Sequence, residues 1–443
     1  MIAHDAKIGI LAPRLARGQI SASELLDGCL SAVAARDDGL HAMLALNPTA
    51  RAAAAAADRA LAEGRTLGPL HGIPIVIKDN IDLAGMPTTS GSVGMCNAMP
   101  LRDADMVARL RAAGAIVVGK TNLSEFSFEI RSRSSLGGDV VHPLDPRVTP
   151  GGLSGGTAVA VHAGFALAGL GTDTGGSIRI PAAYTGLVGF RPAQGALSMR
   201  GIAPLAPSTD TVGPIARSVE DVEILLAAMG LPVGAPPART LRIGVLRQAF
   251  GSDPHIAAAV QRVIAQLERQ DIAIVDPVAL PEDVLPTGGE HIVDAEFADA
   301  FDSYLATNFR PGSVPANIAE LVQSGAHLPE FAETLRARLD RKGGSNAAIL
   351  ACHARLKAAM VGLMAAERLD ALVFPTSQVV PTSLDNPRGG WAPELAARGG
   401  WPALSVPSGS SVTDLPVGLE LTGPAGNEAI LLALARMIEN TAA

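Results

Sequence analysis

Two serines lie among glycines within one short part of this 443-residue chain. Ser154 stands in GGLSGG (151–156), and Ser177 ends GTDTGGS (171–177). Glycine lets the backbone turn sharply and approach a ligand, because it has no Cβ atom. A row of unencumbered N–H groups can stabilise the oxyanion that forms when a serine attacks a carbonyl carbon. The pattern therefore predicts a serine nucleophile, with Ser154 and Ser177 as the two candidates.

Lysine is rare in this sequence, and two lysines end apolar runs. Lys78 follows PIVI and Lys120 follows IVVG. Burial lowers the pKa of a lysine toward neutrality, and a neutral lysine can act as the general base for a serine. Alternatively, each amine extends from a strand end to the surface. The residues alone leave Lys78 and Lys120 equally open as candidate bases.

Two familiar motifs match the sequence by letter but not by context. GAIVVGKT (114–121) fits the phosphate-binding pattern, which must follow a strand and precede a helix. Here a helix is expected before it, and its middle residues form an apolar strand. GLSGG (152–156) fits the nucleophile elbow of α/β-hydrolases, which a buried strand should precede. The preceding segment PLDPRVTP cannot form a central strand, so both interpretations are rejected.

Composition indicates a soluble α/β protein of a reducing compartment, so we expect a cytoplasmic location. Hydrophobic residues make up 48%, net charge is −8 and mean hydropathy is +0.28. No apolar run approaches the ~20 residues of a membrane-spanning helix, and no signal peptide is evident. With 3% aromatic residues and no basic stripe, a nucleic-acid partner is not expected. Cys29, Cys96 and Cys352 form no CxxC pair, which argues against structural zinc.

Strand and helix signals alternate along the chain, which predicts a mostly parallel or mixed sheet with helices on both faces. We expect one large domain over 1–443, with its core at about 60–240 and 365–443. The helical segment at about 285–365 is predicted to shape the substrate pocket. The expected elements are a helix after the capping box Ser21–Glu24, a helix over 47–61, a strand ending at Lys78, a helix from Asp105 to Gly114, strands at 115–119, 242–246 and 272–276, and a helix over 256–269.

Several blocks in order resemble the amidase signature family nearly from end to end. The blocks are GPLHGIPIVIKDNIDLAGMPTTSGS, GAIVVGKTNLSEF, TPGG followed by SGG, GTDTGGSIRIPAAYTGLVGFRP, GWPALSVPSG and LPVGLELTGP. The resemblance implies a single α/β domain with a central mixed sheet surrounded by helices. It also implies hydrolysis of non-peptide carboxamide C–N bonds through a Ser–Ser–Lys triad, without a metal or cofactor.

The resemblance assigns roles to particular residues. It makes Lys78 the base and Ser177 the nucleophile, and it leaves Lys120 as a structural residue. The oxyanion hole would comprise the backbone N–H groups of Thr174, Gly175, Gly176 and Ser177. Asp173 is expected to accept N–H bonds that hold this loop, and Arg179 is expected to be a structural contact.

One position departs from the family pattern. The family places a bridging serine, the first of GGSSGG and held in a cis peptide, 24 positions before the nucleophile; here that position is Leu153. Without the serine hydroxyl, no group relays a proton across the ~5 Å between the lysine and the nucleophile. Loss of a positioned general base lowers the reaction rate by a factor of ~10²–10⁴. A non-proline cis bond costs ~3–4 kcal/mol, which leaves a trans bond and a remodelled loop open. Ser154 remains a candidate helper.

Three functions remain compatible with the sequence. The first is an amidase, with full or attenuated activity, that acts on a small-molecule amide or acyl substrate. The second is an enzyme repurposed for acyl transfer or rearrangement, in which a polar group of the substrate replaces the missing hydroxyl. The third is a non-catalytic amidase-like protein. The apolar surface also permits a homodimer, and no membrane partner is expected.

Overall fold

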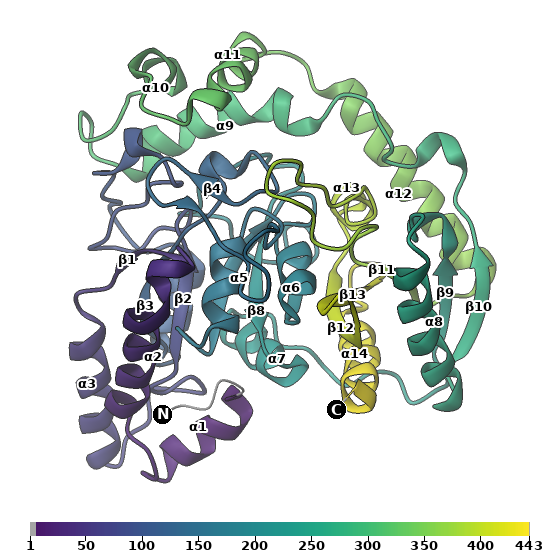
Figure 1. Cartoon of the computed structure of the whole chain (residues 1–443), viewed down its shortest axis with the longest axis horizontal. Helices are drawn as coiled ribbons and strands as arrows, with labels where there is room; N and C mark the ends of the chain where they lie inside the picture. Colours follow the sequence, from purple (N-terminus) through teal and green to yellow (C-terminus); the bar gives the residue numbers. More distant parts are fainter. Residues whose placement is uncertain (1–5, 443) are drawn as a thin grey trace.

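The computed structural model describes residues 6–442, and an eleven-stranded mixed sheet runs through that part of the chain (Figure 1). Its strand order is β1-β3-β2-β6-β8-β7-β12-β13-β11-β9-β10. The strands are β1 Met43–Leu46, β2 Pro74–Lys78, β3 Ile116–Thr121, β6 Ala168–Asp173, β7 Val188–Arg191, β8 Thr211–Ala216, β9 Arg242–Leu246, β10 Ala273–Val278, β11 Ala371–Pro375, β12 Ala403–Val412 and β13 Leu415–Thr422; β4 Arg133–Ser134 and β5 Gly138–Asp139 form a separate pair.

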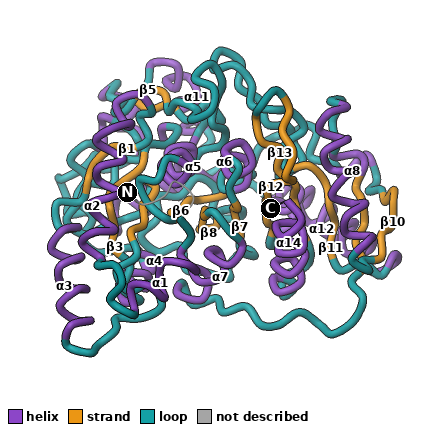
Figure 2. Tube along the Cα trace, turned by 60° about the horizontal axis from the view of Figure 1, so that its bottom comes forward, coloured by secondary structure: helices purple, strands orange, loops and turns teal. Residues whose placement is uncertain are grey.

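Helices surround the sheet (Figure 2). They are α1 Ile8–Ala16, α2 Ala22–Arg36, α3 Ala50–Ala62, α4 Asp105–Ala112, α5 Gly155–His162, α6 Arg179–Thr185, α7 Val219–Ala228, α8 Pro254–Arg269, α9 Ile292–Asn308, α10 Ile318–Ser324, α11 Ala332–Asp340, α12 Ala347–Glu367, α13 Glu394–Gly399 and α14 Glu428–Ala442. The predicted fold, one large α/β domain with a mixed sheet flanked by helices, is confirmed.

Local signals predicted individual elements well. The Ser21 hydroxyl accepts a hydrogen bond from the Glu24 N–H, and the Glu24 side chain accepts one from the Ser21 N–H, which completes the capping box. Strand β2 ends at Lys78 as predicted. Strand β3 follows α4 directly and extends to Thr121. A helix before this strand confirms that 114–121 does not have the strand–loop–helix context of a phosphate loop.

Parallel pairing brings the chemically important strand ends to one edge of the sheet. Strand β2 pairs in parallel with β3 and with β6, and Ile77 lies beside Leu170. Lys78 and Thr172 therefore both come at the carboxyl ends of adjacent strands. The loop 174–178 leaves β6 at this edge and leads into α6, while the loop 151–154 leads into α5.

The helices α9, α10 and α11 form a layer along the top of the molecule in Figure 1. These helices and the loops beneath them share a hydrophobic cluster that is separate from the main core. In it, Phe126 of the loop after β3 packs edge-on against Phe301 of α9, with ring centroids 5.7 Å apart. Tyr304 of α9 donates a hydrogen bond to Asp82 Oδ1 at 2.7 Å, and both residues are buried. These contacts fix the layer on the sheet, beside the edge that carries Lys78.

Helix α12 is, among residues 6–442, the one helix whose length and composition would allow it to cross a membrane. It has 21 residues, and its most apolar window has a mean hydropathy of 1.4. Core helices of soluble proteins that are mostly buried can meet the same criteria. In α12, 28% of this window is buried, and Leu356, Met360 and Met364 pack in the main core. The absence of a membrane partner therefore remains a prediction from composition.

Candidate active site

A pocket of about 380 Å³ opens where the two glycine-rich loops meet the helical layer. Gly152 and Leu153 of the first loop line it together with Ser177 of the second. Residues His291 and Arg338 close it from the helical segment. Volumes of this size suit small-molecule ligands.

The loop that ends at Ser177 is held in shape by Asp173. The carboxylate accepts a hydrogen bond from the Gly176 N–H at 2.9 Å and one from the Ile178 N–H at 3.1 Å. Gly176 adopts a φ of +125°, and a Cβ atom there would lie 2.7 Å from Pro393 Cβ, so a larger residue is excluded. The predicted role of Asp173 as the anchor of this loop is confirmed.

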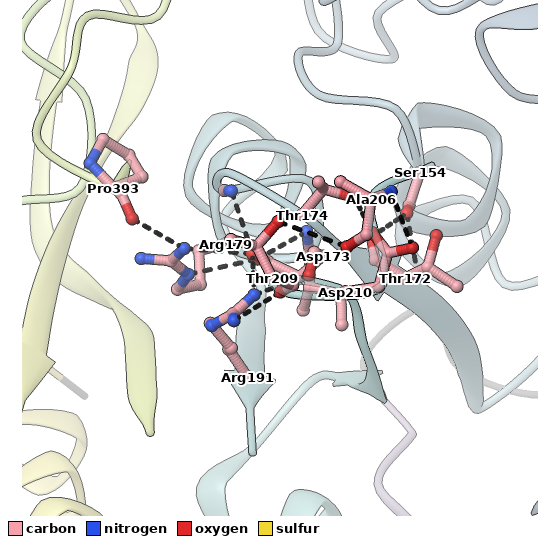
Figure 3. A network of polar contacts seen from close by, with 12 residues as sticks. Ser154, Thr172, Asp173, Thr174, Arg179, Arg191, Ala206, Thr209, Asp210 and Pro393 are labelled. Atoms are coloured by element: carbon pink, nitrogen blue, oxygen red, sulfur yellow. Dashed lines mark hydrogen bonds and ion pairs between the residues drawn. The ribbon is translucent and has the colours of Figure 1, made fainter. Parts of the chain in front are cut away.

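Two buried arginines neutralise Asp173 (Figure 3). Arg179 Nη2 and Arg191 Nη1 lie 3.0 and 2.9 Å from Asp173 Oδ1, and Arg179 also pairs with Glu420. Burial alone would raise the pKa of Asp173, but the two guanidinium groups and the hydrogen bonds hold it well below its usual value. The expected structural role of Arg179 is therefore confirmed.

One of the four N–H groups predicted to form the oxyanion hole already has a hydrogen-bond partner within the protein. The N–H of Gly176 already donates to Asp173, whereas no hydrogen bond within residues 6–442 engages the N–H groups of Gly175 and Ser177. Gly175 and Ser177 both line the pocket. The Thr174 N–H group likewise has no hydrogen-bond partner in the described residues, and Thr174 also lines the pocket. Three of the four predicted donors are therefore available to a developing oxyanion.

Lys78 lies at the end of β2, fully buried, and contacts a threonine. Its Nζ donates a hydrogen bond to Thr172 Oγ1 at 2.7 Å. Burial lowers the pKa of Lys78 to about 7, against the opposing charges of Asp210 and Asp173. An amine with this pKa is substantially neutral at physiological pH, which is the protonation state a general base needs.

Lys120, the other candidate base, belongs to a different buried group. Its Nζ lies 2.7 Å from Asp79 Oδ1 and donates to the Pro87 carbonyl at 3.1 Å. These contacts join β3 to the segment that follows β2. The structure therefore agrees with a structural role for Lys120.

Ser154 points away from the pocket. Its hydroxyl donates to the Thr172 carbonyl at 3.2 Å and accepts from the Thr172 N–H at 3.4 Å. In the described residues it forms no hydrogen bond with Lys78 or Ser177. The peptides on both sides of Leu153 are trans, because Asp276–Pro277 is the one cis bond in the described chain. Leu153 packs against the phenylalanine cluster and lines the pocket.

Sequence reasoning missed three residues of this region. Asp210, fully enclosed, accepts from the Thr174 hydroxyl at 2.5 Å and from the Leu205 N–H at 2.8 Å. Thr172 belongs to the GTDTGGS block, but residue type and spacing assign it no role. Arg338 of α11 stacks on Phe128, 4.0 Å from the ring centroid, and donates through Nε to Asp294 at 2.9 Å. No local signal marks an arginine in a charged helix as a pocket residue.

Comparison with known proteins agrees with this architecture. The model of the amidase family matches residues 24–432. The chain is 34% identical to a glutamyl-tRNA(Gln) amidotransferase subunit of Deinococcus radiodurans, over 97% of this chain and 96% of that protein. It is 33% identical to the corresponding protein of Synechococcus sp. (strain WH7803), over 97% and 96%.

Solved structures give the same result. The native peptide amidase of Stenotrophomonas maltophilia superposes with a TM-score of 0.87 at 32% identity, and 99% of this chain and 97% of that chain are covered. An amidase family protein of Bacillus anthracis gives 0.86 at 26% identity, with 98% and 90% covered. The chain belongs to the amidase signature family.

Proposed function

We infer that this protein is a serine amidase in which Ser177 attacks a carboxamide carbon and Lys78 acts as the general base. The observation that carries this inference is the position of Ser177. It lines the pocket at the end of a loop whose N–H groups at Gly175 and Ser177 are free, close to the strand edge where a buried Lys78 has a pKa of about 7.

The steps follow from these groups. Ser177 Oγ forms a bond to the carbonyl carbon while its proton leaves toward Lys78. The oxyanion is stabilised by the N–H groups of Gly175 and Ser177. Lys78, now an ammonium, returns a proton to the nitrogen of the leaving group, and water then hydrolyses the acyl-enzyme in the same way.

The pocket supports a small substrate with a hydrogen-bond acceptor. Its wall combines the apolar Leu153 and Phe128 with the guanidinium of Arg338, which stays stacked on Phe128. The relatives, a peptide amidase and amidotransferase subunits, point to cleavage of a carboxamide C–N bond. Hydrolysis is the first candidate, and acyl transfer to an amine is the alternative.

The test is covalent trapping at Ser177. We expect a fluorophosphonate probe to add its mass to the peptide that contains Ser177, and Ser177→Ala to abolish this adduct, while Ser154→Ala, at the neighbouring serine that points away from the pocket, still forms it. With primary carboxamides as substrates and an added amine acceptor, free acid indicates hydrolysis and a new amide indicates transfer. A folded wild-type protein that gives no adduct and no turnover would be a non-catalytic member of the family.

A further inference from the structure

Thr172 is the residue whose hydroxyl meets the candidate base. Its Oγ1 lies 2.7 Å from Lys78 Nζ, and Asn80 Nδ2 donates to the same oxygen at 3.1 Å. In residues 6–442 no other hydroxyl forms a hydrogen bond with the Lys78 amine. Both Lys78 and Thr172 are buried, so bulk water does not compete for these contacts.

The loop beside Thr172 also touches the nucleophile. The Ser154 hydroxyl donates a hydrogen bond to the Thr172 carbonyl and accepts one from the Thr172 N–H (Figure 3). Two residues earlier, a Cβ atom on Gly152 would lie 3.4 Å from Ser177 Cα. The three-residue stretch 152–154 therefore has Thr172 at one end and Ser177 at the other, and the residue between them, Leu153, has no hydroxyl. In residues 6–442 the Thr172 and Ser177 side chains form no hydrogen bond with each other, so a relay requires the Ser177 hydroxyl to turn toward Thr172 as it attacks.

Resting on the function inferred above, we propose that Thr172 is a catalytic residue, the relay through which the proton of Ser177 reaches Lys78. As Ser177 Oγ bonds to the substrate carbon, its O–H bond breaks and the proton moves to Thr172 Oγ1. The proton of Thr172 moves to the lone pair of neutral Lys78, which becomes an ammonium. The carbonyl π electrons move to the oxygen, so atoms and charge balance.

The hydrogen-bonding capacity of a hydroxyl fits this role. A threonine hydroxyl has one proton to donate and two lone pairs to accept with. Asn80 occupies one lone pair. In the observed contact Lys78 Nζ donates to the other lone pair. When neutral Lys78 instead accepts the hydroxyl proton, that lone pair is released for the proton of Ser177. Asn80 also stabilises the partial negative charge on Oγ1 during the transfer.

The experiment follows the rate at which a fluorophosphonate labels Ser177 between pH 5 and 10. We expect Thr172→Val to slow labelling by ~10²-fold and to remove its rise near pH 7. Thr172→Ser should restore the rate by at least tenfold over Thr172→Val. Leu153→Ser in the Thr172→Val background should also restore labelling, because it supplies a second hydroxyl beside Ser177. Thr157→Val, which removes a buried hydroxyl that bonds Thr121 instead, is the matched control.

The outcomes separate this inference from the proposed function. If Thr172→Val is labelled at the wild-type rate with the same pH midpoint, Thr172 is not the relay, although Ser177 can still be the nucleophile. Equal slowing in Thr172→Val and Thr172→Ser also refutes it. If the wild-type protein is never labelled at Ser177, the proposed function fails first. Should Thr172→Val not fold, Thr172→Ala replaces it with the same two criteria.

Discussion

Replacement of Asp173 by asparagine should destabilise the whole protein as well as its candidate active site. Asp173 is fully buried, and every group that faces its carboxylate is a donor. Oδ1 accepts from the Gly176 N–H, Arg179 Nη2 and Arg191 Nη1, while Oδ2 accepts from the Ile178 N–H and Arg179 Nε. Asparagine puts an NH₂ group in place of one of these oxygens.

The size of the effect follows from this arrangement. With the NH₂ in the Oδ2 position, two buried donors lose their acceptor, and in the Oδ1 position three do. Each unsatisfied buried group costs ~1–3 kcal/mol, and breaking a buried charge pair by removing one partner costs ~3–5 kcal/mol. We therefore expect Asp173→Asn to lower the free energy of unfolding by ~3–5 kcal/mol, a large share of the total for a typical protein.

The assay is equilibrium unfolding in urea, followed by circular dichroism, together with fluorophosphonate labelling of Ser177. Asp27→Asn is the control, because Asp27 pairs with Arg51 at the surface, where both side chains are more than half exposed. Such a pair contributes at most ~1 kcal/mol. Asp173→Asn should also slow labelling, since either the Gly176 N–H or the Ile178 N–H loses the acceptor that shapes the loop. An unfolding free energy within ~1 kcal/mol of wild type would refute the reasoning.

Two further predictions concern the base and the missing hydroxyl. Leu153→Ser places a hydroxyl on the pocket wall beside Ser177 and should raise hydrolysis of simple carboxamides at least ~10-fold; unchanged turnover in a folded variant would mean that leucine belongs to a different working mechanism. Because Lys78 acts only when neutral and has a pKa of about 7, labelling of Ser177 should rise as pH increases through about 7 and fall below it. A rising limb near the ordinary lysine value of ~10 would contradict this assignment.

The elements that the sequence predicted well depend on contacts within a few residues. The capping box of α2 and the end of β2 at Lys78 are examples, because N-terminal caps and apolar runs are local features. From the sequence, the sheet could be parallel for the most part or mixed. The observed mixed order depends on the antiparallel pairs of β6 with β8 and of β7 with β12, which join strands that are distant in the sequence and that no local pattern pairs.

The candidate site divides in the same way. The glycine spacing around Ser177 pointed to a loop with free N–H groups, and the structure places Gly175 and Ser177 in the pocket. The sequence could not show that Gly176 donates its N–H to Asp173. It also could not place Arg338 against Phe128, since these residues lie 210 positions apart and meet only when α11 packs over the loop.

By itself the sequence determined the family resemblance and the presence of leucine at position 153, because these are properties of residue type and spacing. The resemblance in turn implies that Ser177, and not Ser154, is the nucleophile. The tertiary structure decided which hydroxyl the buried lysine meets. Parallel pairing of β2 with β6 puts Thr172 Oγ1 at 2.7 Å from Lys78, while Ser154 turns to the Thr172 backbone. A hydrogen bond spans only about 3 Å, and Lys78 and Thr172 lie 94 residues apart in the sequence. Their contact can therefore be seen only once the pairing of their strands is known.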